Sequence, residues 1–382
     1  MKKHTGMIAA SLMVMALATG CSQGGAEPSV AAPAQTTAAP TTAETEAQPQ
    51  ASEESKAPEE TTKADVVPAV QETSKESGYK TGLAVVSSMT SSKEAGEADG
   101  TAQVDSVVAA VIVDEQGKIV SCYLDTAQNK MGFTAEGKVV MTEGFQTKRE
   151  LGDQYGMKAA SGIGKEWYEQ AQAMEEYVIG KTAEEVRGIA VDDSTKPTDV
   201  DLLAGVTVKI GSYKNAIAEA AESAQAIGTM PGDKLGVGII TNMNKSKDAE
   251  ADKEGQCQAY STYVAVTTDA DGTITAAVID STQGTVKFDA QGKITSDLTT
   301  GVKTKRQLGD EYGMRAASGI GKEWYEQAAN MEAYLIGKTA EGVTGIAVNE
   351  DQKPTDPDLA AGVTVSIGGY QTAAVKAIKN AK

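Results

Sequence analysis

The chain has 382 residues, a formal net charge of −18 at pH 7 and a pI near 4.6. This acidic balance excludes nucleic-acid-binding proteins, because binding to phosphates requires clustered Lys and Arg. The single His is His4 and the three Cys are Cys21, Cys122 and Cys257. These residues form no repeated ligand set, so we expect neither a metal site nor a catalytic triad.

The N-terminus has the features of an export signal. Two basic residues, Lys2 and Lys3, precede an apolar run over residues 7–18 that is too short to span a bilayer. The run leads into LATGC, which ends at Cys21 and resembles the lipobox of bacterial lipoproteins, with Ala18 where Leu is commonest. We therefore expect residues 1–20 to be a lipoprotein signal peptide and Cys21 to be lipidated. The mature chain would then be anchored in the cell membrane on its extracytoplasmic face. The alternative is a plain secretory signal that is cleaved near Cys21.

Residues 21–76 are rich in Ala, Thr, Glu and Pro and have no periodic apolar pattern. Such a composition buries too little apolar surface to offset the entropy lost on folding. We expect a disordered tether with a reach on the order of 40 Å.

The remainder of the chain is a tandem repeat. LGDQYGMKAASGIGKEWYEQA at residues 151–171 returns at residues 308–328 with only two substitutions. A second shared block, DLLAGVT at 201–207 and DLAAGVT at 358–364, follows at the same offset. We therefore expect two modules, 77–225 and 226–382, and a function that one module can carry.

Each module begins with strand patterns. A short strand is predicted at residues 83–88 and again at 237–241. Two β-rich runs, 107–113 and 118–124, flank a turn that ends at Gly117 and predict a hairpin, which the second copy repeats around Gly272. The turns at 134–137 and 289–292 predict a further hairpin.

Helical patterns follow the strands. Ala171, Met174 and Val178 lie four, seven and eleven residues after Trp167, which predicts a helix over about 165–179 with Trp167 in the core. Thr182 begins a capping box, and Ala-rich closing helices are predicted from Tyr213 and Tyr370. The predicted fold class is α+β, with an antiparallel sheet and helices packed on one face in each module. Phe133 and Phe288 occupy equivalent positions and are expected to mark the two cores.

The repeated DLLAGVT and DLAAGVT blocks carry the candidate chemistry. A Thr hydroxyl can hold the phosphate of flavin mononucleotide (FMN) as a phosphoester, and a flanking Gly lets the backbone approach closely. A helix that starts just downstream offers free N–H groups to an anion.

The blocks resemble the motif Asp-x-x-(Ser/Thr/Ala)-Gly-Ala-Thr of the FMN-binding domain family. This family occurs in flavin subunits of Rnf and Nqr redox complexes and in lipoproteins of Gram-positive extracellular electron transfer. The order of hairpin, Gly-Ile-Gly, helix, motif and closing helix extends the resemblance over about 105–225 and 260–382. Val206 and Val363 replace the usual Ala, and the spacing to the closing helix is about two residues longer than in the family.

The resemblance implies that a flavin transferase attaches FMN covalently to the motif Thr. By position, the attachment residues would be Thr207 and Thr364. The recognition and turn residues would be Asp201, Gly205, Asp358 and Gly362. The glycines before the helix, which could line the flavin, are Gly162, Gly164, Gly319 and Gly321.

Plainer interpretations remain open for the same residues. The run after Gly205 alternates like a simple strand with a solvent-facing Thr207, followed by a turn and helix cap at residues 211–212. The Gly-Ile-Gly segments could be only the turn into the helix. Glu166 and Glu169, spaced like paired carboxylates, are expected to be surface acids. Cys122 and Cys257 are expected to be small buried residues.

These patterns lead to one expected function and one rival. We expect a lipid-anchored electron carrier with FMN on each module, which receives electrons from an unknown donor and passes them between modules or to several acceptors. Such a protein would be a carrier rather than a substrate-converting enzyme. The rival is a non-redox surface lipoprotein of the same doubled fold that binds a ligand or another protein.

Overall fold

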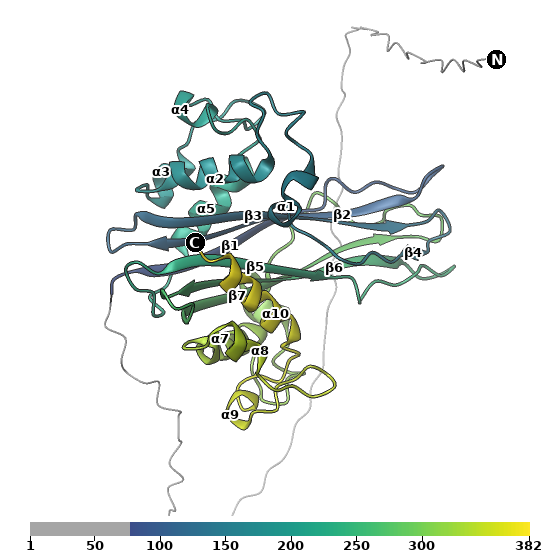
Figure 1. Ribbon diagram of the computed structural model, residues 1–382. Coiled ribbons are helices and arrows are strands. Elements are labelled where there is room, and N and C mark those ends of the chain that lie inside the picture. The colour runs from purple at the N-terminus through teal and green to yellow at the C-terminus, as the bar shows by residue number, and fades with distance from the viewer. Residues whose placement is uncertain (1–76) are drawn as a thin grey trace, which may run out of the picture. The chain divides into compact units, whose positions relative to one another are not determined.

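The computed structural model describes residues 77–382 (Figure 1). The expected signal peptide at 1–20, the lipidation residue Cys21 and the tether at 21–76 lie outside the described residues. Within residues 77–382, no helix is both long and apolar enough to cross a membrane.

The first half of the described chain contains a four-stranded antiparallel sheet of order β1-β2-β3-β4, followed by helices. The strands are β1 (Lys80–Ser88), β2 (Gly100–Val113), β3 (Ile119–Phe133) and β4 (Val139–Val140). The helices are α1 (Lys148–Leu151), the 3-10 helix η1 (Gly152–Tyr155), α2 (Trp167–Val178), α3 (Ala183–Arg187), α4 (Val200–Leu203) and α5 (Gly211–Glu222).

The second half contains a three-stranded antiparallel sheet of order β5-β6-β7, again followed by helices. The strands are β5 (Lys234–Asn242), β6 (Gly255–Thr268) and β7 (Ile274–Phe288). The helices are α6 (Lys305–Leu308), η2 (Gly309–Tyr312), α7 (Trp324–Leu335), α8 (Ala340–Thr344), α9 (Pro357–Ala360) and α10 (Gly368–Asn380). The fold is therefore α+β, as the sequence predicts.

The predicted hairpin forms the centre of the first sheet. The β2–β3 turn closes through the Gly117 N–H, which donates to the Asp114 carbonyl oxygen at 3.0 Å, and Gly117 has a φ of 73°. The strands are longer than predicted, because β2 begins at Gly100 and β3 continues to Phe133. The turn at 134–137 leads into the short β4, which confirms the further hairpin in this half. In the second half the corresponding turn leads only to an isolated bridge between Phe288 and Ile294.

The predicted helices are present near their expected bounds. Trp167 begins α2 and is 1% exposed, and Val178 ends it. Thr182 forms the predicted capping box at the start of α3. The closing helix α5 begins at Gly211, two residues before Tyr213, and α10 correspondingly begins at Gly368.

The two faces of each sheet have different neighbours. On one face, the side chains of Ala109 and Val111 pack against Trp167 and Met174 of α2 and Ile217 of α5. The second half repeats this arrangement with α7 and α10. Because side chains alternate along a strand, the residues between them point to the opposite face of the sheet. Each sheet therefore has helices on one face only, as predicted.

The helix-free faces of the two sheets pack against each other. Val108 and Ala110 of β2 share a buried cluster with Val237 of β5 and Tyr263 of β6. The Tyr263 hydroxyl donates to Ser106 Oγ of the other sheet at 3.0 Å. The result is four layers, helices, sheet, sheet and helices, as Figure 1 shows.

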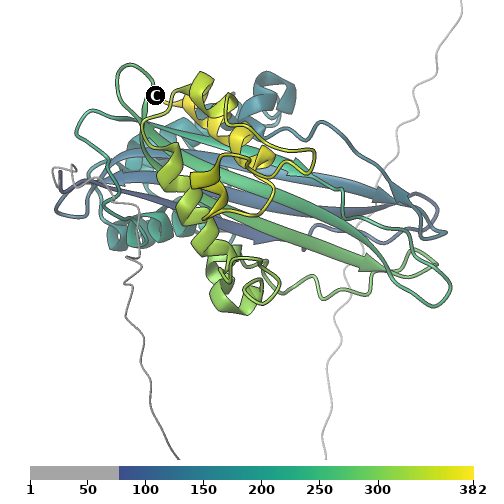
Figure 2. The same cartoon turned by 90° about the horizontal axis from the view of Figure 1, so that it is seen from below.

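Phe133 and Phe288 do not mark two separate cores. Their rings stack on each other across the two sheets, with centroids 4.3 Å apart and an interplanar angle of 7°. Both belong to one shared buried cluster at the ends of the long strands, which also contains Cys257. Figure 2 shows that these strands extend well beyond the helices α7 and α10. Apolar contact between the sheets covers the strand ends there.

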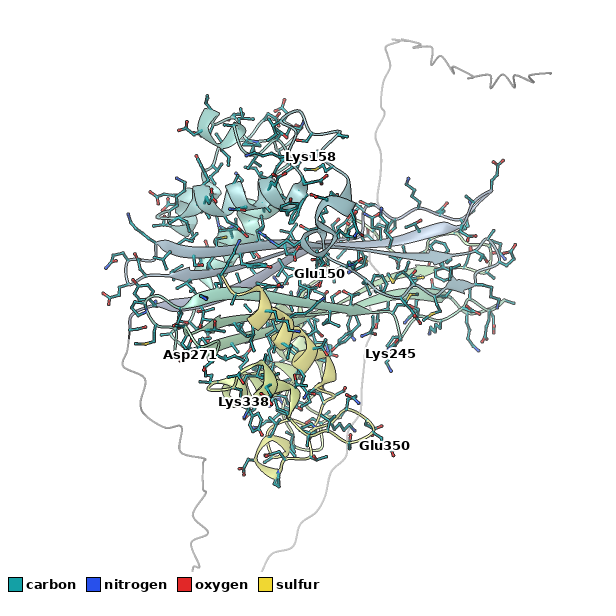
Figure 3. The ribbon with its side chains drawn as sticks, viewed as in Figure 1. Glu150, Lys158, Lys245, Asp271, Lys338 and Glu350 are labelled. Atoms are coloured by element: carbon teal, nitrogen blue, oxygen red, sulfur yellow. The ribbon has the colours of Figure 1, made fainter. Side chains whose placement is uncertain are left out.

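The C-terminal helix and the residues after it also join the two halves. Lys376 of α10 forms an ion pair with Glu150 of α1. Figure 3 labels Glu150, which lies between the helical layers. Lys382 donates from Nζ to Glu175 of α2 at 2.6 Å. Glu175 is also paired with Arg149, so charged groups of both halves meet at this edge of the sheets.

Candidate functional site

The DLLAGVT block is not a strand. Residues 201–203 belong to α4, and residues 206–210 form an irregular connection to α5. Val206 and Ile210 are 0% exposed and hold this connection in the core. The plain strand interpretation is therefore wrong, and Val206 is packed in the core.

Thr207 lies between Val206 and Ile210 and is half-buried. Its backbone N–H donates to Gln170 Oε1 at 2.8 Å, and its hydroxyl donates to the same oxygen at 3.3 Å. Thr364 repeats the arrangement with Gln327 Oε1, at 2.9 Å from the backbone nitrogen and 3.3 Å from the hydroxyl oxygen. Each motif hydroxyl is thus held at the surface by a buried amide.

The two glutamines were missed in the sequence analysis. Gln170 is 1% exposed and Gln327 is 0% exposed. Their positions in the sequence could have revealed them, because Gln170 lies three residues after Trp167 and four before Met174. A polar residue therefore occurs within the apolar stripe that predicts the helix.

Gly205 and Gly362 lie where the motif turn approaches α2 and α7. A Cβ atom on Gly205 would lie 2.7 Å from Ala173 Cβ, and one on Gly362 would lie 2.8 Å from Asn330 Cγ. Real Cβ atoms do not come this close to other heavy atoms. A glycine therefore allows close packing at both positions, against a fixed methyl group at Gly205 and against a side chain that can move at Gly362.

Asp201 and Asp358 are exposed in the first turns of α4 and α9. The acids that cap these helices lie two residues earlier. Asp199 accepts hydrogen bonds from the backbone nitrogens of Asp201 and Leu202, each at 3.0 Å. Asp356 caps α9 in the same way. These N-caps were not predicted, although Asp before a short helical pattern is a typical cap.

The glycines of the Gly-Ile-Gly segments lie in the exposed turns that lead into α2 and α7, at Gly162, Gly164, Gly319 and Gly321. Gly164 and Gly321 have positive φ values of 65° and 64°. The same turn contains Ser161, whose Oγ accepts a hydrogen bond from Gln170 Nε2 at 3.1 Å. Hydrogen bonds through Ser161 and Gln170 therefore connect the turn to Thr207.

Glu166 is not a surface acid. It is 2% exposed and accepts hydrogen bonds from the backbone nitrogens of Met157 and Lys158 at 2.9 and 2.8 Å. Burial raises the pKa of Glu166, but backbone N–H donors from Lys158, Met157 and Trp167 hold it below the ordinary value. Its role is to fix the loop before α2, and Glu323 is buried in the same way.

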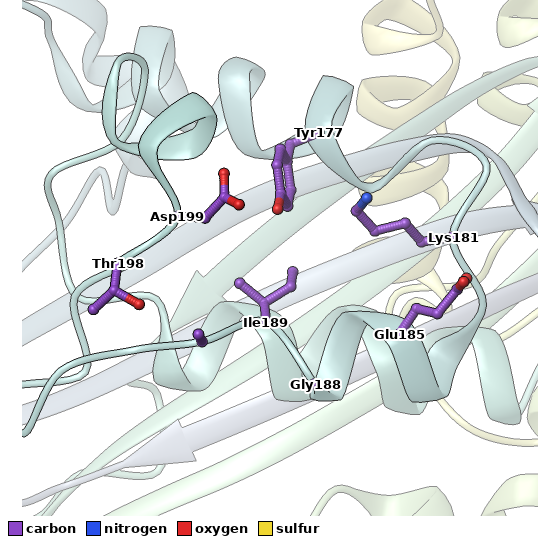
Figure 4. A pocket seen from close by; sticks show the side chains of 8 residues that line it. Tyr177, Lys181, Glu185, Gly188, Ile189, Thr198 and Asp199 are labelled. Carbon is purple, nitrogen blue, oxygen red and sulfur yellow. The ribbon is translucent and has the colours of Figure 1, made fainter.

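A cavity of about 410 Å³, which is open to solvent, lies at the C-terminal end of α2 (Figure 4). Tyr177, Lys181 and Asp199 line it, together with residues of and after α3. Lys181 Nζ lies 4.4 Å from the centroid of the Tyr177 ring. Burial and the nearby charges of Asp199 and Asp201 raise the pKa of Tyr177.

The helix α2 connects the cavity to the hydrogen-bond partner of Thr207. Thr207 does not line the cavity, but its partner Gln170 lies seven residues before Tyr177 on the same helix. Seven residues of helix correspond to about 10 Å. In the second half the aligned residues Tyr334 and Lys338 make the same ring contact, at 4.1 Å, whereas Gly342 replaces Glu185.

Residues 77–382 contain no group of three or more His, Cys, Asp or Glu side chains that could hold a metal ion. Cys122 and Cys257 are free and buried, as predicted.

Comparison with known proteins gives one partial match. The chain is 37% identical over 91 residues to a protein named chlorophenol reductase from Desulfitobacterium hafniense. The match covers 20% of this chain and 28% of that protein, so the chain spans little more than a quarter of its relative's length. No family model and no solved structure matches the chain.

Proposed function

We propose that this chain is a lipid-anchored, extracytoplasmic flavoprotein that carries FMN on Thr207 and Thr364 and transfers electrons across or out of the cell envelope. The observation that supports this proposal most strongly is the repeated hydroxyl geometry. In both halves a half-buried Thr donates to a buried Gln at 3.3 Å, next to a Gly that permits close packing. The same arrangement in two halves favours a shared role for the two hydroxyls.

The helices that follow the motif support a phosphate nearby. Ile210 and Ile367 precede α5 and α10 and provide no side-chain cap. In contrast, Thr147, Thr182 and Asp199 cap α1, α3 and α4. A helix N-terminus without a cap retains free N–H groups and a partial positive charge, which favour an anion. A phosphate on Thr207 would be attached four residues before such an end.

The cavity beside Tyr177 supports a ring site in the first half. Its volume of about 410 Å³ lies within the range of small-molecule sites, roughly 300–1,000 Å³. Tyr177 offers an aromatic surface, and Lys181 and Asp199 offer polar contacts at its edge. A flavin attached at Thr207 would have to extend about 10 Å along α2 to enter this cavity.

When bound, FMN would supply reversible electron transfer, so the protein's own residues would bind and orient it. The proposed partners are the membrane, through a lipid on Cys21, a flavin transferase, and a redox donor and acceptor of unknown identity. The partial similarity to a protein named as a reductase favours a redox role and does not indicate a cofactor.

The cavity also favours a second candidate function. Its lining includes Lys181, Glu185 and Asp199, and Thr207 is outside it. A small polar ligand could bind there without any covalent bond. In that case the protein would be a non-redox surface lipoprotein that binds a ligand or serves as an interaction module.

The two functions differ in the effect of removing a hydroxyl. Thr207→Val and Thr364→Val are nearly isosteric and retain the backbone hydrogen bond to Gln. After coexpression with a flavin transferase, we expect each single variant to show about half of the wild-type flavin fluorescence in a denaturing gel, and the double variant to show none. Fluorescent double variant, or non-fluorescent wild-type protein, would contradict covalent attachment at these residues.

A further inference from the structure

Gln170 is fixed by hydrogen bonds at both ends of its amide. Its Nε2 donates to Ser161 Oγ at 3.1 Å and to the Lys165 carbonyl oxygen at 3.4 Å. Ser161 Oγ is itself held by the backbone nitrogens of Ile163 and Lys165. The oxygen and nitrogen of the amide are therefore not interchangeable, because Nε2 has two acceptors and Oε1 has only donors around it.

Three donors converge on Gln170 Oε1. They are the backbone nitrogens of Thr207 and Val208, at 2.8 and 3.3 Å, and the Thr207 hydroxyl, at 3.3 Å. Gln327 has the same surroundings, with Nε2 3.0 Å from Ser318 Oγ and 3.4 Å from the Lys322 carbonyl oxygen. The network thus occurs in both halves and includes the Gly-Ile-Gly turn each time.

The direction of the hydroxyl hydrogen determines where the oxygen can react. Because the hydrogen of Thr207 points to Gln170, the lone pairs of Oγ1 point away from the buried amide. Thr207 is half-buried, so part of the residue is exposed to solvent. The contact with Gln170 therefore fixes the position of Oγ1, and a fixed position favours attack because the reacting atoms must be aligned.

We propose that Gln170 and Gln327 are positioning residues that orient the hydroxyls of Thr207 and Thr364 for attachment of the flavin phosphate. This inference rests on the proposed function. In the step, a bond forms between Thr Oγ1 and phosphorus, and the phosphoanhydride bond of a flavin dinucleotide donor breaks. The leaving nucleotide takes the electron pair of that bond. The hydroxyl turns its hydrogen away from the buried Gln, the proton passes to a base of the transferase or to water, and no redox change occurs.

Gln170 affects how fast the phosphoester forms on Thr207, but it does not affect how stable the phosphoester is afterwards. Once Oγ1 is esterified it has no hydrogen, so its contact with Gln170 Oε1 is lost. The backbone nitrogens of Thr207 and Val208 still donate to that oxygen. Gln170 is therefore needed for the rate of attachment, and the attached flavin does not depend on it.

The test uses the second site as an internal control. Full-length chain, produced without flavin, is mixed with a flavin transferase and flavin dinucleotide, and loading of each Thr is followed by peptide mass spectrometry. Gln170→Met removes the acceptor, whereas Gln172→Leu changes an exposed residue of the same helix. For Gln170→Met we expect loading of Thr207 to slow about 10- to 100-fold through kcat, with KM and the loading of Thr364 unchanged.

Equal loading rates at Thr207 in Gln170→Met and Gln172→Leu would contradict the proposal. Wild-type chain that loads at neither Thr would overturn the proposed function itself, and the inference with it. If Gln170→Met unfolds the chain, loading of Thr364 falls as well, and Ser161→Ala then decides. This variant removes one acceptor of Nε2 and keeps Gln170 Oε1, so slower loading of Thr207 with unchanged loading of Thr364 supports the inference, and unchanged loading of Thr207 contradicts it.

Discussion

Asp125 is a buried carboxyl group at the edge where the two sheets meet. It is 4% exposed and accepts hydrogen bonds from the backbone nitrogens of Thr126 at 2.7 Å and Arg149 at 3.3 Å. Burial raises its pKa to about 6, and the hydrogen bonds and the Arg149 charge oppose this only in part. The folded state therefore binds a proton that the unfolded chain has already lost at pH 5.

The raised pKa gives an expected pH dependence. The pKa lies above its unfolded value, so the stability contributed by the proton is lost as pH rises from about 4 to about 6. The loss is on the order of 3 kcal/mol at most, at about 1.4 kcal/mol per pH unit. Asn at this position does not titrate. The difference in free energy of unfolding between Asp125→Asn and the wild type, measured by urea unfolding, should therefore shift by about 1–3 kcal/mol in favour of the variant as pH rises from 4 to 7.5. A constant difference between the two proteins over this range would refute the role of Asp125.

The candidate site shows which residues a sequence can reveal. Thr207, Gly205 and their repeats could be found because they form a short motif that occurs twice. Gln170 could not be assigned from the motif, because it lies 37 residues earlier and meets Thr207 only after α2 and the motif turn fold together. Glu166 was misassigned because its partners are backbone N–H groups, which a sequence pattern does not show.

The closing helices α5 and α10 lie very close to the strands that they cover. A Cβ atom on Gly238 of β5 would overlap the carbonyl oxygen of Ala373 on α10, and Gly82 of β1 meets α5 in the same way. These glycines allow the helix backbone to rest directly on the strand.

A methyl group added at Gly238 should push α10 away from its sheet. We expect Gly238→Ala to lower the free energy of unfolding by about 1–3 kcal/mol, because the clash is with backbone and cannot relax by a side-chain movement. The control is Gly96→Ala in an exposed loop, where nothing lies within 4 Å of the added methyl group. That change should be neutral or raise stability by up to about 1 kcal/mol. Urea unfolding measures the free energy of unfolding of both variants. An equal change in the two variants would contradict close packing of α10 on Gly238.

Most elements were predictable because their patterns are local. The hairpin around Gly117 and the helix from Trp167 follow from turn chemistry and apolar spacing. The run from Gly205 to Ile210 was ambiguous because it alternates like a strand. The Ile210 N–H donates to the carbonyl oxygen of Thr195, in a loop, and this contact replaces strand pairing.

Over the whole molecule, the packing of one sheet on the other was not predictable. Runs such as Val107–Val113 are apolar on both faces, which is typical of strands covered on both sides. That pattern does not say what covers the second face. The partner is the other half of the chain, and repeat symmetry alone did not reveal it.

The shared interior predicts that the halves depend on each other. Residues 77–225 alone would expose Leu83, Val85 and Val108, together with Phe133. We expect this fragment to aggregate or self-associate, and to become soluble as a 1:1 complex when it is coexpressed with residues 226–382. Size-exclusion chromatography with light scattering measures this, and a soluble, monomeric first half would be inconsistent with the four-layer packing.

The four layers also place the two candidate threonines far apart. Figure 3 shows Lys158 and Lys338 labelled in the helical layers on opposite sides of the sheets. Packed sheets are about 10 Å apart and a helix is about 10 Å wide, so α2 and α7 are separated by roughly 30 Å. Electron transfer weakens steeply with distance. Under the proposed function, each site therefore exchanges electrons with its own partner rather than with the other site.

The most direct test of the account is the intact mass, in denaturant, of the protein purified from its own cell envelope. The account predicts a mass above that of the lipidated chain by two FMN minus two water, one adduct on Thr207 and one on Thr364. Protein that has the mass of the lipidated chain alone, from cells that contain an active flavin transferase, would contradict it.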